Sequence, residues 1–174
     1  VQDLIFENAN FYLTQKNYQF FFDLINKNFE DGDITIKNSN IFFKNAQDEV
    51  LFINKILKMK YYYEKKEFKN IFYSENELFK IPFSMESFLN KDQNKIFSQI
   101  NFNLLQMKVE NELSIFDEKK IGKSEILFNK LKRIIEYKVE KNSLDFHIFD
   151  KKEVPNITYK GKINFKPFYG SFEG

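Results

Sequence analysis

Alternating apolar and polar positions dominate the chain and are clearest at residues 157–169. Most alternate positions in that segment are Ile, Tyr or Phe, with Thr, Lys and Asn between them. Because successive side chains of a β-strand point to opposite faces, this pattern predicts a strand with one apolar and one polar face. The same period returns at residues 96–104, 105–115 and 135–139. We therefore predict a mainly β fold of about ten half-buried antiparallel strands.

One segment has the period of a helix instead. Five side chains fall at i, i+3, i+4, i+7 and i+11 of a single stripe: Tyr18, Phe21, Phe22, Ile25 and Phe29. Thr14 is a suitable N-cap, and the Asp-Gly-Asp sequence at residues 31–33 is a suitable end. We expect one short amphipathic helix near residues 15–29, lying over an open end of the sheet. Contact of this helix with a membrane surface or a partner is the alternative.

Irregular positions interrupt the alternation at three places. The apolar phase slips within residues 34–44, which predicts a bulge. The polar residues 74–77 predict a hairpin turn between strands at 68–73 and 78–85. The phase also flips between Leu104 and Leu105, which requires a bulge or a tight reversal.

The charges of the chain nearly cancel. With 27 Lys and Arg against 25 Asp and Glu, the net charge is +2, far from the surplus that phosphate binding requires. Lys and aromatic residues interleave at residues 58–69 and 160–166, as on a surface that stacks bases, but the charge balance favours no nucleic-acid partner. The absence of Cys excludes disulfides, thiolate nucleophiles and Cys-based metal sites.

Catalytic motifs are equally sparse. His147 is the only histidine, and no Gly-x-Ser-x-Gly segment accompanies it. Gly122 begins a Gly-Lys-Ser sequence, but Asp117 occupies the position of the first glycine of a phosphate-binding loop. Carboxylate pairs such as Glu110 and Glu112 alternate outward on a predicted strand. We therefore expect no enzyme activity, no cofactor and no metal.

The ends of the chain suggest a longer protein. No run approaches the roughly 18 apolar residues of a membrane-spanning helix, and no signal peptide is present. The chain starts at Val1 rather than Met and stops at Gly174 directly after a predicted strand. We expect residues 1–174 to be a single segment cut at both ends.

Residues 21–43, 79–83 and 159–168 together resemble the AsmA-like proteins of Gram-negative envelopes, a wider group that includes TamB and YhdP. The resemblance implies a repeating β-groove, in which a twisted antiparallel sheet curls into a trough. It also implies a periplasmic location, an inner-membrane anchor outside this chain, and phospholipid transport between the inner and outer membranes during outer-membrane biogenesis. Phospholipid acyl chains would lie along the apolar trough.

A continuous apolar lining is what an acyl chain needs, because each methylene kept from water is worth about 0.8 kcal/mol. We expect the following side chains to line the trough: Ile96, Ile100, Phe102, Leu104, Ile157, Tyr159, Ile163 and Phe165. The side chains expected to face water are Lys160, Lys162, Asn164 and Lys166. An ordinary closed core is the alternative for the apolar set.

Two other functions fit the same pattern. One is an architectural or assembly-assisting periplasmic segment that contacts envelope proteins through its sheet edges or helix and conducts no lipid. The other is a closed ligand-binding barrel, which requires the first and last strands to pair.

Overall fold

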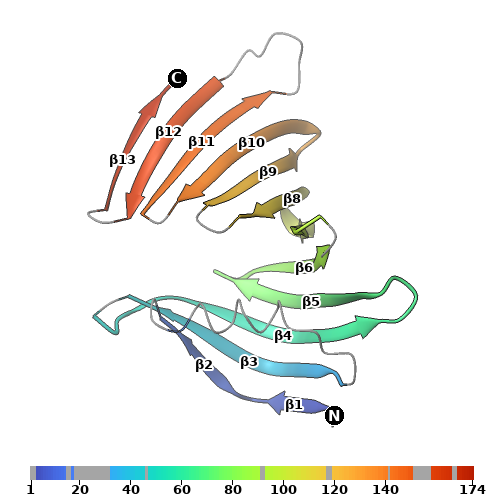
Figure 1. Ribbon diagram of the computed structural model, residues 1–174. Coiled ribbons are helices and arrows are strands. Elements are labelled where there is room, and N and C mark those ends of the chain that lie inside the picture. The colour runs from blue at the N-terminus through green and yellow to red at the C-terminus, as the bar shows by residue number, and fades with distance from the viewer. Residues whose placement is uncertain are drawn as a thin grey trace. The chain divides into compact units, whose positions relative to one another are not determined.

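The computed structural model describes residues 3–14, 17, 32–45, 47–90, 93–116, 119–140, 142–150, 158–165 and 168–174. These residues form thirteen β-strands and one 3-10 helix (Figure 1). The prediction of a mainly β fold is confirmed, with more strands than expected. The helix predicted near residues 15–29 lies outside the described residues, apart from Asn17.

The chain divides into two compact units. The first comprises Val1–Leu89 with Ile100–Leu104, and the second comprises Asn90–Gln99 with Leu105–Gly174. Strands of the first unit are β1 (Leu4–Glu7), β2 (Asn10–Leu13), β3 (Ile34–Lys44), β4 (Val50–Glu64), β5 (Lys69–Leu78) and β6 (Ile81–Asn90), of which the last residue, Asn90, belongs to the second unit. Strand β7 (Lys95–Phe102) and the 3-10 helix η1 (Asn103–Leu105) contribute residues to both units. Strands of the second unit are β8 (Met107–Ile115), β9 (Lys119–Phe128), β10 (Leu131–Glu140), β11 (Ser143–Asp150), β12 (Thr158–Phe165) and β13 (Phe168–Glu173).

The sheet is mixed, which corrects the expectation of a purely antiparallel one. Hydrogen-bonded neighbours follow chain order from β3 to β13, and the described pairs among β3–β6 and β8–β13 are antiparallel. Strands β1 and β2, however, both pair in parallel with β3. Residues 14–33 separate β2 from β3, more than the roughly dozen residues that a crossover needs. In this strand order β1 and β13 are the two end strands. A closed barrel, the alternative expected from the sequence, would require these two strands to pair with each other.

The irregular positions explain the breaks in alternation. Asn38 in β3 has a φ of 47°, a left-handed conformation that Asn tolerates, and the register of β3 against β4 shifts between Phe43 and Lys44. The irregularity predicted for residues 34–44 is thus confirmed. The reversal predicted at Leu104 is also confirmed, since η1 ends β7 there. Gln106, with a φ of 48°, follows η1 before β8 begins.

The predicted hairpin turn at residues 74–77 is wrong. These residues lie inside β5, and the chain turns instead at Phe79 and Lys80, whose φ values are 51° and 65°. Ser74 and Asn76 are buried, and Asn76 Nδ2 donates a hydrogen bond to Ser74 Oγ at 2.7 Å. These two polar side chains therefore have a hydrogen bond within the strand. The polarity of the segment alone did not indicate a turn.

The first unit buries one face of its strands. Ser39, Ile56 and Asn76 pair in one row across β3, β4 and β5, and all three are buried. Asn54 Nδ2 donates to Asn76 Oδ1 at 3.1 Å, which extends the polar contacts along this face. Phe43 and Phe52 stack on the same face, with ring centroids 4.3 Å apart. Apolar packing and hydrogen bonds between polar side chains therefore form this core together.

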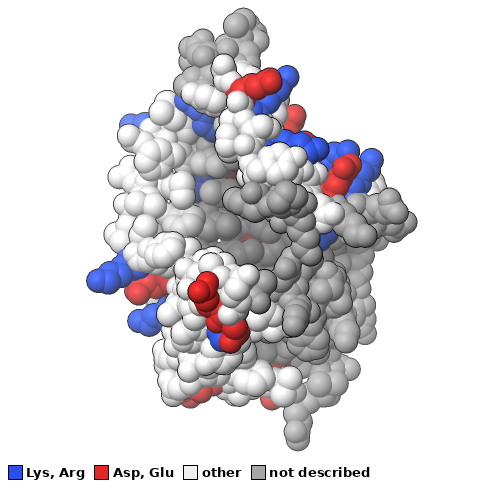
Figure 2. All heavy atoms as spheres, turned by 90° about the vertical axis from the view of Figure 1, so that its left-hand side faces the viewer, with Lys and Arg blue, Asp and Glu red and all other residues white. Residues whose placement is uncertain are grey.

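The opposite face of the first unit carries a row of charged side chains. Glu7, Lys37, Lys58 and Glu75 are successive partners across β1, β3, β4 and β5. Each Lys is next to a Glu, which offsets the repulsion between the two central ammonium groups. On the molecular face shown in Figure 2, Lys and Arg side chains likewise lie close to Asp and Glu.

Alkaline pH is expected to destabilise the first unit through Tyr61. This side chain is 5% exposed, and burial raises the pKa of its phenol to about 12, against about 10 in an unfolded chain. The unfolded state therefore loses its proton first, so the stabilisation is complete below pH 10 and is lost as the pH rises through 12. Between pH 9 and 12 the wild type should lose about 2 kcal/mol more unfolding free energy than Tyr61→Phe. Urea titrations of both proteins at each pH measure the free energy of unfolding. Equal losses in the two proteins would contradict the prediction.

Candidate functional site

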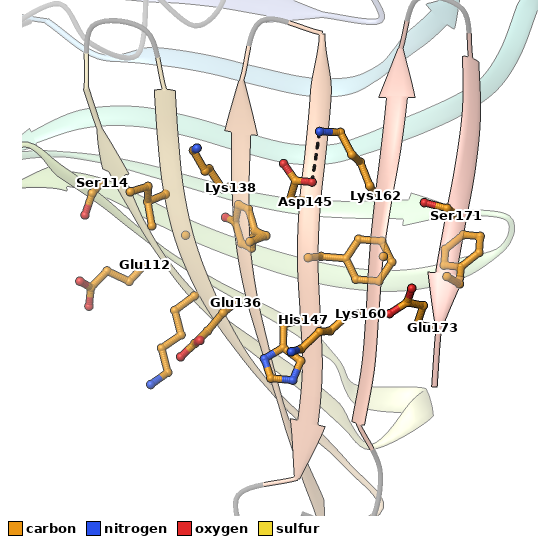
Figure 3. Close-up of a pocket in the computed structure, with 17 residues that line it drawn as sticks. Glu112, Ser114, Glu136, Lys138, Asp145, His147, Lys160, Lys162, Ser171 and Glu173 are labelled. Carbon is orange, nitrogen blue, oxygen red and sulfur yellow. Dashed lines mark ion pairs between the residues drawn. The ribbon is translucent and has the colours of Figure 1, made fainter.

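The register of β8–β13 places two rows of side chains on one face of the second unit, because directly paired residues share a face. The first row is Glu112, Lys123, Glu136, His147, Lys160 and Glu173. The second row is Ser114, Ile121, Lys138, Asp145, Lys162 and Ser171. We call this surface the charged face (Figure 3).

These two rows line a hollow of about 780 Å³. Its remaining lining residues, Gly122, Tyr137, Phe146, Gly161 and Phe172, belong to the row between them. Four Lys and four acidic side chains line the hollow, so their formal charges cancel. Asp145 and Lys162 form an ion pair at 3.5 Å, drawn as a dashed line in Figure 3. The hollow thus has no charge surplus with which to select an anion or a cation.

His147 lies in this hollow, on β11. Its ring centroid is 4.8 Å from that of Phe149, and its Nε2 atom is buried without a hydrogen-bond partner among the described residues. A nucleophile–base pair requires such a hydrogen bond, and none involving Nε2 is present. The described residues also contain no group of three His, Asp or Glu placed to hold a metal ion.

The other face of the same strands is mainly apolar, although Lys120 and the ion-paired Arg133 and Asp150 also lie on it. One row contains Leu113, Tyr137, Phe146 and Phe172; the next contains Ile135, Ile148 and Tyr159; a third contains Val139, Leu144 and Ile163. Each of these ten side chains, which define the apolar face, is half-buried or exposed. Tyr159 and Phe172 are 50% and 68% exposed. Large apolar surfaces left accessible are typical of interaction sites rather than of closed cores.

The predicted trough residues are distributed over both units. Tyr159 and Ile163 lie on the apolar face of the second unit, and Ile96 on β7 is buried in the same unit. Ile100 and Phe102 are half-buried in the first unit. Leu104 is 72% exposed in η1 and so is not on a strand.

The other predicted positions differ in whether and where the structure places them. Phe102 stacks on Phe83, with centroids 5.1 Å apart. Ile157 and Lys166 lie outside the described residues, and the side chain of Phe165 is also outside them. The polar residues Lys160, Lys162 and Asn164 lie on the charged face, opposite Tyr159 and Ile163.

A polar group interrupts the apolar face at its β8 side. Tyr137 Oη and Ser124 Oγ each donate a hydrogen bond to Asn111 Oδ1 at 2.7 Å. Burial raises the pKa of the Tyr137 phenol, against the effect of its hydrogen bonds to Asn111 and Ser124. We call these three residues the polar triad. Sequence reasoning missed it, because Asn111 and Tyr137 are far apart in sequence and only strand register brings them together.

Comparisons of the chain with family models, curated proteins and solved structures found no match. Within the described part of the chain, no helix has the length and apolar character needed to cross a membrane.

Proposed function

We propose that the apolar face of the second unit shelters phospholipid acyl chains, and that the chain is a segment of an AsmA-like envelope protein with a trough-shaped β-groove. In this role it serves phospholipid transport between the inner and outer membranes and outer-membrane biogenesis. The supporting observation is that all ten side chains of the apolar face are half-buried or exposed. A closed core of this size would bury most of them.

The dimensions of this face suit an acyl chain. Six strands at a spacing of about 4.8 Å give a face roughly 24 Å wide. Each methylene that leaves water for such a surface contributes about 0.8 kcal/mol. No charged partner is required, and charged residues are concentrated on the opposite face. The proposed setting is the periplasm, with the inner-membrane anchor outside this chain.

Introducing a charge on the apolar face tests the proposal. The Ile163→Asp variant should stay folded, because Ile163 is only half-buried, yet bind at least tenfold less lipid, since an unpaired carboxylate disfavours an apolar ligand by a few kcal/mol. The protein would be incubated with vesicles of phosphatidylethanolamine and phosphatidylglycerol and separated from them. Native mass spectrometry then counts the bound lipid.

Thr158→Asp is the matched control. Thr158 is exposed on the same strand but on the charged face, so the variant adds the same charge and should retain lipid. Wild-type protein that binds no phospholipid would contradict the proposal. Unchanged binding by Ile163→Asp would contradict it as well, and loss of folding in that variant would indicate a closed core.

A second function is favoured by the end strands. Leu4, Ile5 and Phe6 of β1 are exposed, as are Tyr169 and Phe172 of β13. Exposed apolar side chains on edge strands suit pairing with another protein, as an architectural or assembly-assisting segment requires. Such a segment would bind envelope proteins and carry no lipid, so the lipid count above separates the two functions.

A further inference from the structure

The polar triad is built by a contact across three strands. Tyr137 is on β10, Asn111 is on β8, and the pairing of Gly122 with Tyr137 places β9 between them. A Cβ added at Gly122 would lie 2.0 Å from Tyr137 Cζ and 2.3 Å from Tyr137 Oη. The tyrosine ring therefore lies over the bare backbone of Gly122, and this position allows its hydroxyl to reach Asn111 Oδ1 at 2.7 Å.

The triad has more donors than its internal hydrogen bonds use. A carboxamide supplies two N–H donors and each hydroxyl supplies one, whereas the described bonds use only the two hydroxyl donors. Asn111 Nδ2 takes part in neither of these two bonds. Exchanging the amide oxygen and nitrogen would free the hydroxyl donors instead, because a hydroxyl both donates and accepts. In either arrangement, donors that the triad's own hydrogen bonds do not use remain on this mainly apolar face.

The surroundings define the ligand chemistry. Leu113 is the next apolar-face residue on β8, and Ile135 pairs directly with Ser124. All three members of the triad are uncharged, and Arg133, in the neighbouring row of the same face, is ion-paired with Asp150 at 2.7 Å. A phosphate would call for cationic donors, whereas neutral N–H and O–H groups beside apolar side chains match an uncharged carbonyl oxygen. Ester carbonyls are the groups of a glycerophospholipid that lie next to its acyl chains.

We propose that the polar triad binds the ester carbonyl oxygens of a glycerophospholipid and so sets the position at which its acyl chains enter the apolar face. This inference rests on the proposed function and adds to it a preference for lipids whose acyl chains are linked through esters. Asn111 is the donor to the carbonyl, Tyr137 and Ser124 orient its amide, and Gly122 leaves space for the tyrosine ring.

A pair of lipids differing only in linkage tests this role. The probes are diester phosphatidylethanolamine and its dialkyl ether analogue with chains of equal length, which lacks both carbonyls. Wild-type protein should bind the diester about tenfold more tightly, the effect of one or two neutral hydrogen bonds. Asn111→Leu should bind both lipids equally. Tyr137→Phe keeps the ring over Gly122 and should lose part of the preference, which provides a second measurement if Asn111→Leu does not fold.

Asn164→Leu makes the same change on the charged face and should keep the wild-type preference. Equal affinity of the wild type for diester and diether lipids would overturn the role of the triad while leaving the proposed function intact. An undiminished preference in both triad variants would overturn it too. If wild-type protein binds neither lipid, the proposed function fails along with the inference.

Discussion

The Ile56→Asp variant is expected to be unfolded. Ile56 is completely buried on β4, between Ser39 and Asn76. A carboxylate there has no cationic partner on its row, and an unpaired buried charge costs several kcal/mol. Since the total stability of a domain is about 5–15 kcal/mol, most of it would be lost. Circular dichroism and urea unfolding measure the result.

Ile53→Asp provides the matched control for this variant. Ile53 is also on β4, but it pairs with Phe42 and is 45% exposed. The same carboxylate stays in water at this position, so the variant should keep the wild-type spectrum and lose less than about 1 kcal/mol. If both variants fold equally well, the assignment of the buried face in the first unit is wrong.

Gly122→Val is expected to produce the second largest effect. The new side chain would occupy the space of the Tyr137 ring, with its Cβ 2.0 Å from Tyr137 Cζ. Forcing the ring away lowers the free energy of unfolding by about 1–3 kcal/mol. Loss of the hydrogen bond to Asn111 lowers it by about 1 kcal/mol more. The melting temperature should fall by roughly 10 °C. The pKa of Tyr137 should also return toward its ordinary value, because the ring is no longer buried.

Gly170→Val is the control for the glycine substitution. Gly170 is exposed on β13, and a Cβ there would lie 3.2 Å from the ring of Phe172, which is itself exposed. The ring can move into solvent, so the melting temperature should change by less than about 2 °C. Calorimetry and ultraviolet titration of the tyrosines distinguish the variants. An equal effect of both substitutions would mean that Tyr137 is not held over Gly122.

Local patterns were informative wherever one strand face is apolar and the other polar. The alternation of Tyr159 and Ile163 with Lys160 and Lys162 identified β12 and its two faces. The same reasoning failed at Ser74 and Asn76. Two buried and hydrogen-bonded polar side chains there give the same polar sequence pattern as a turn. A polar residue indicates an exposed position only when its side chain has no hydrogen-bond partner inside the protein.

The linear order of residue types was sufficient to establish a mainly β chain with amphipathic strands, because the direction of each side chain follows from its position in the strand. It could not establish which strands pair or in which register. Only the folded chain decided that β1 and β2 run parallel to β3, and that Gly122 lies under Tyr137 with Asn111 within reach. These contacts join residues distant in sequence, so they depend on strand pairing rather than on local composition.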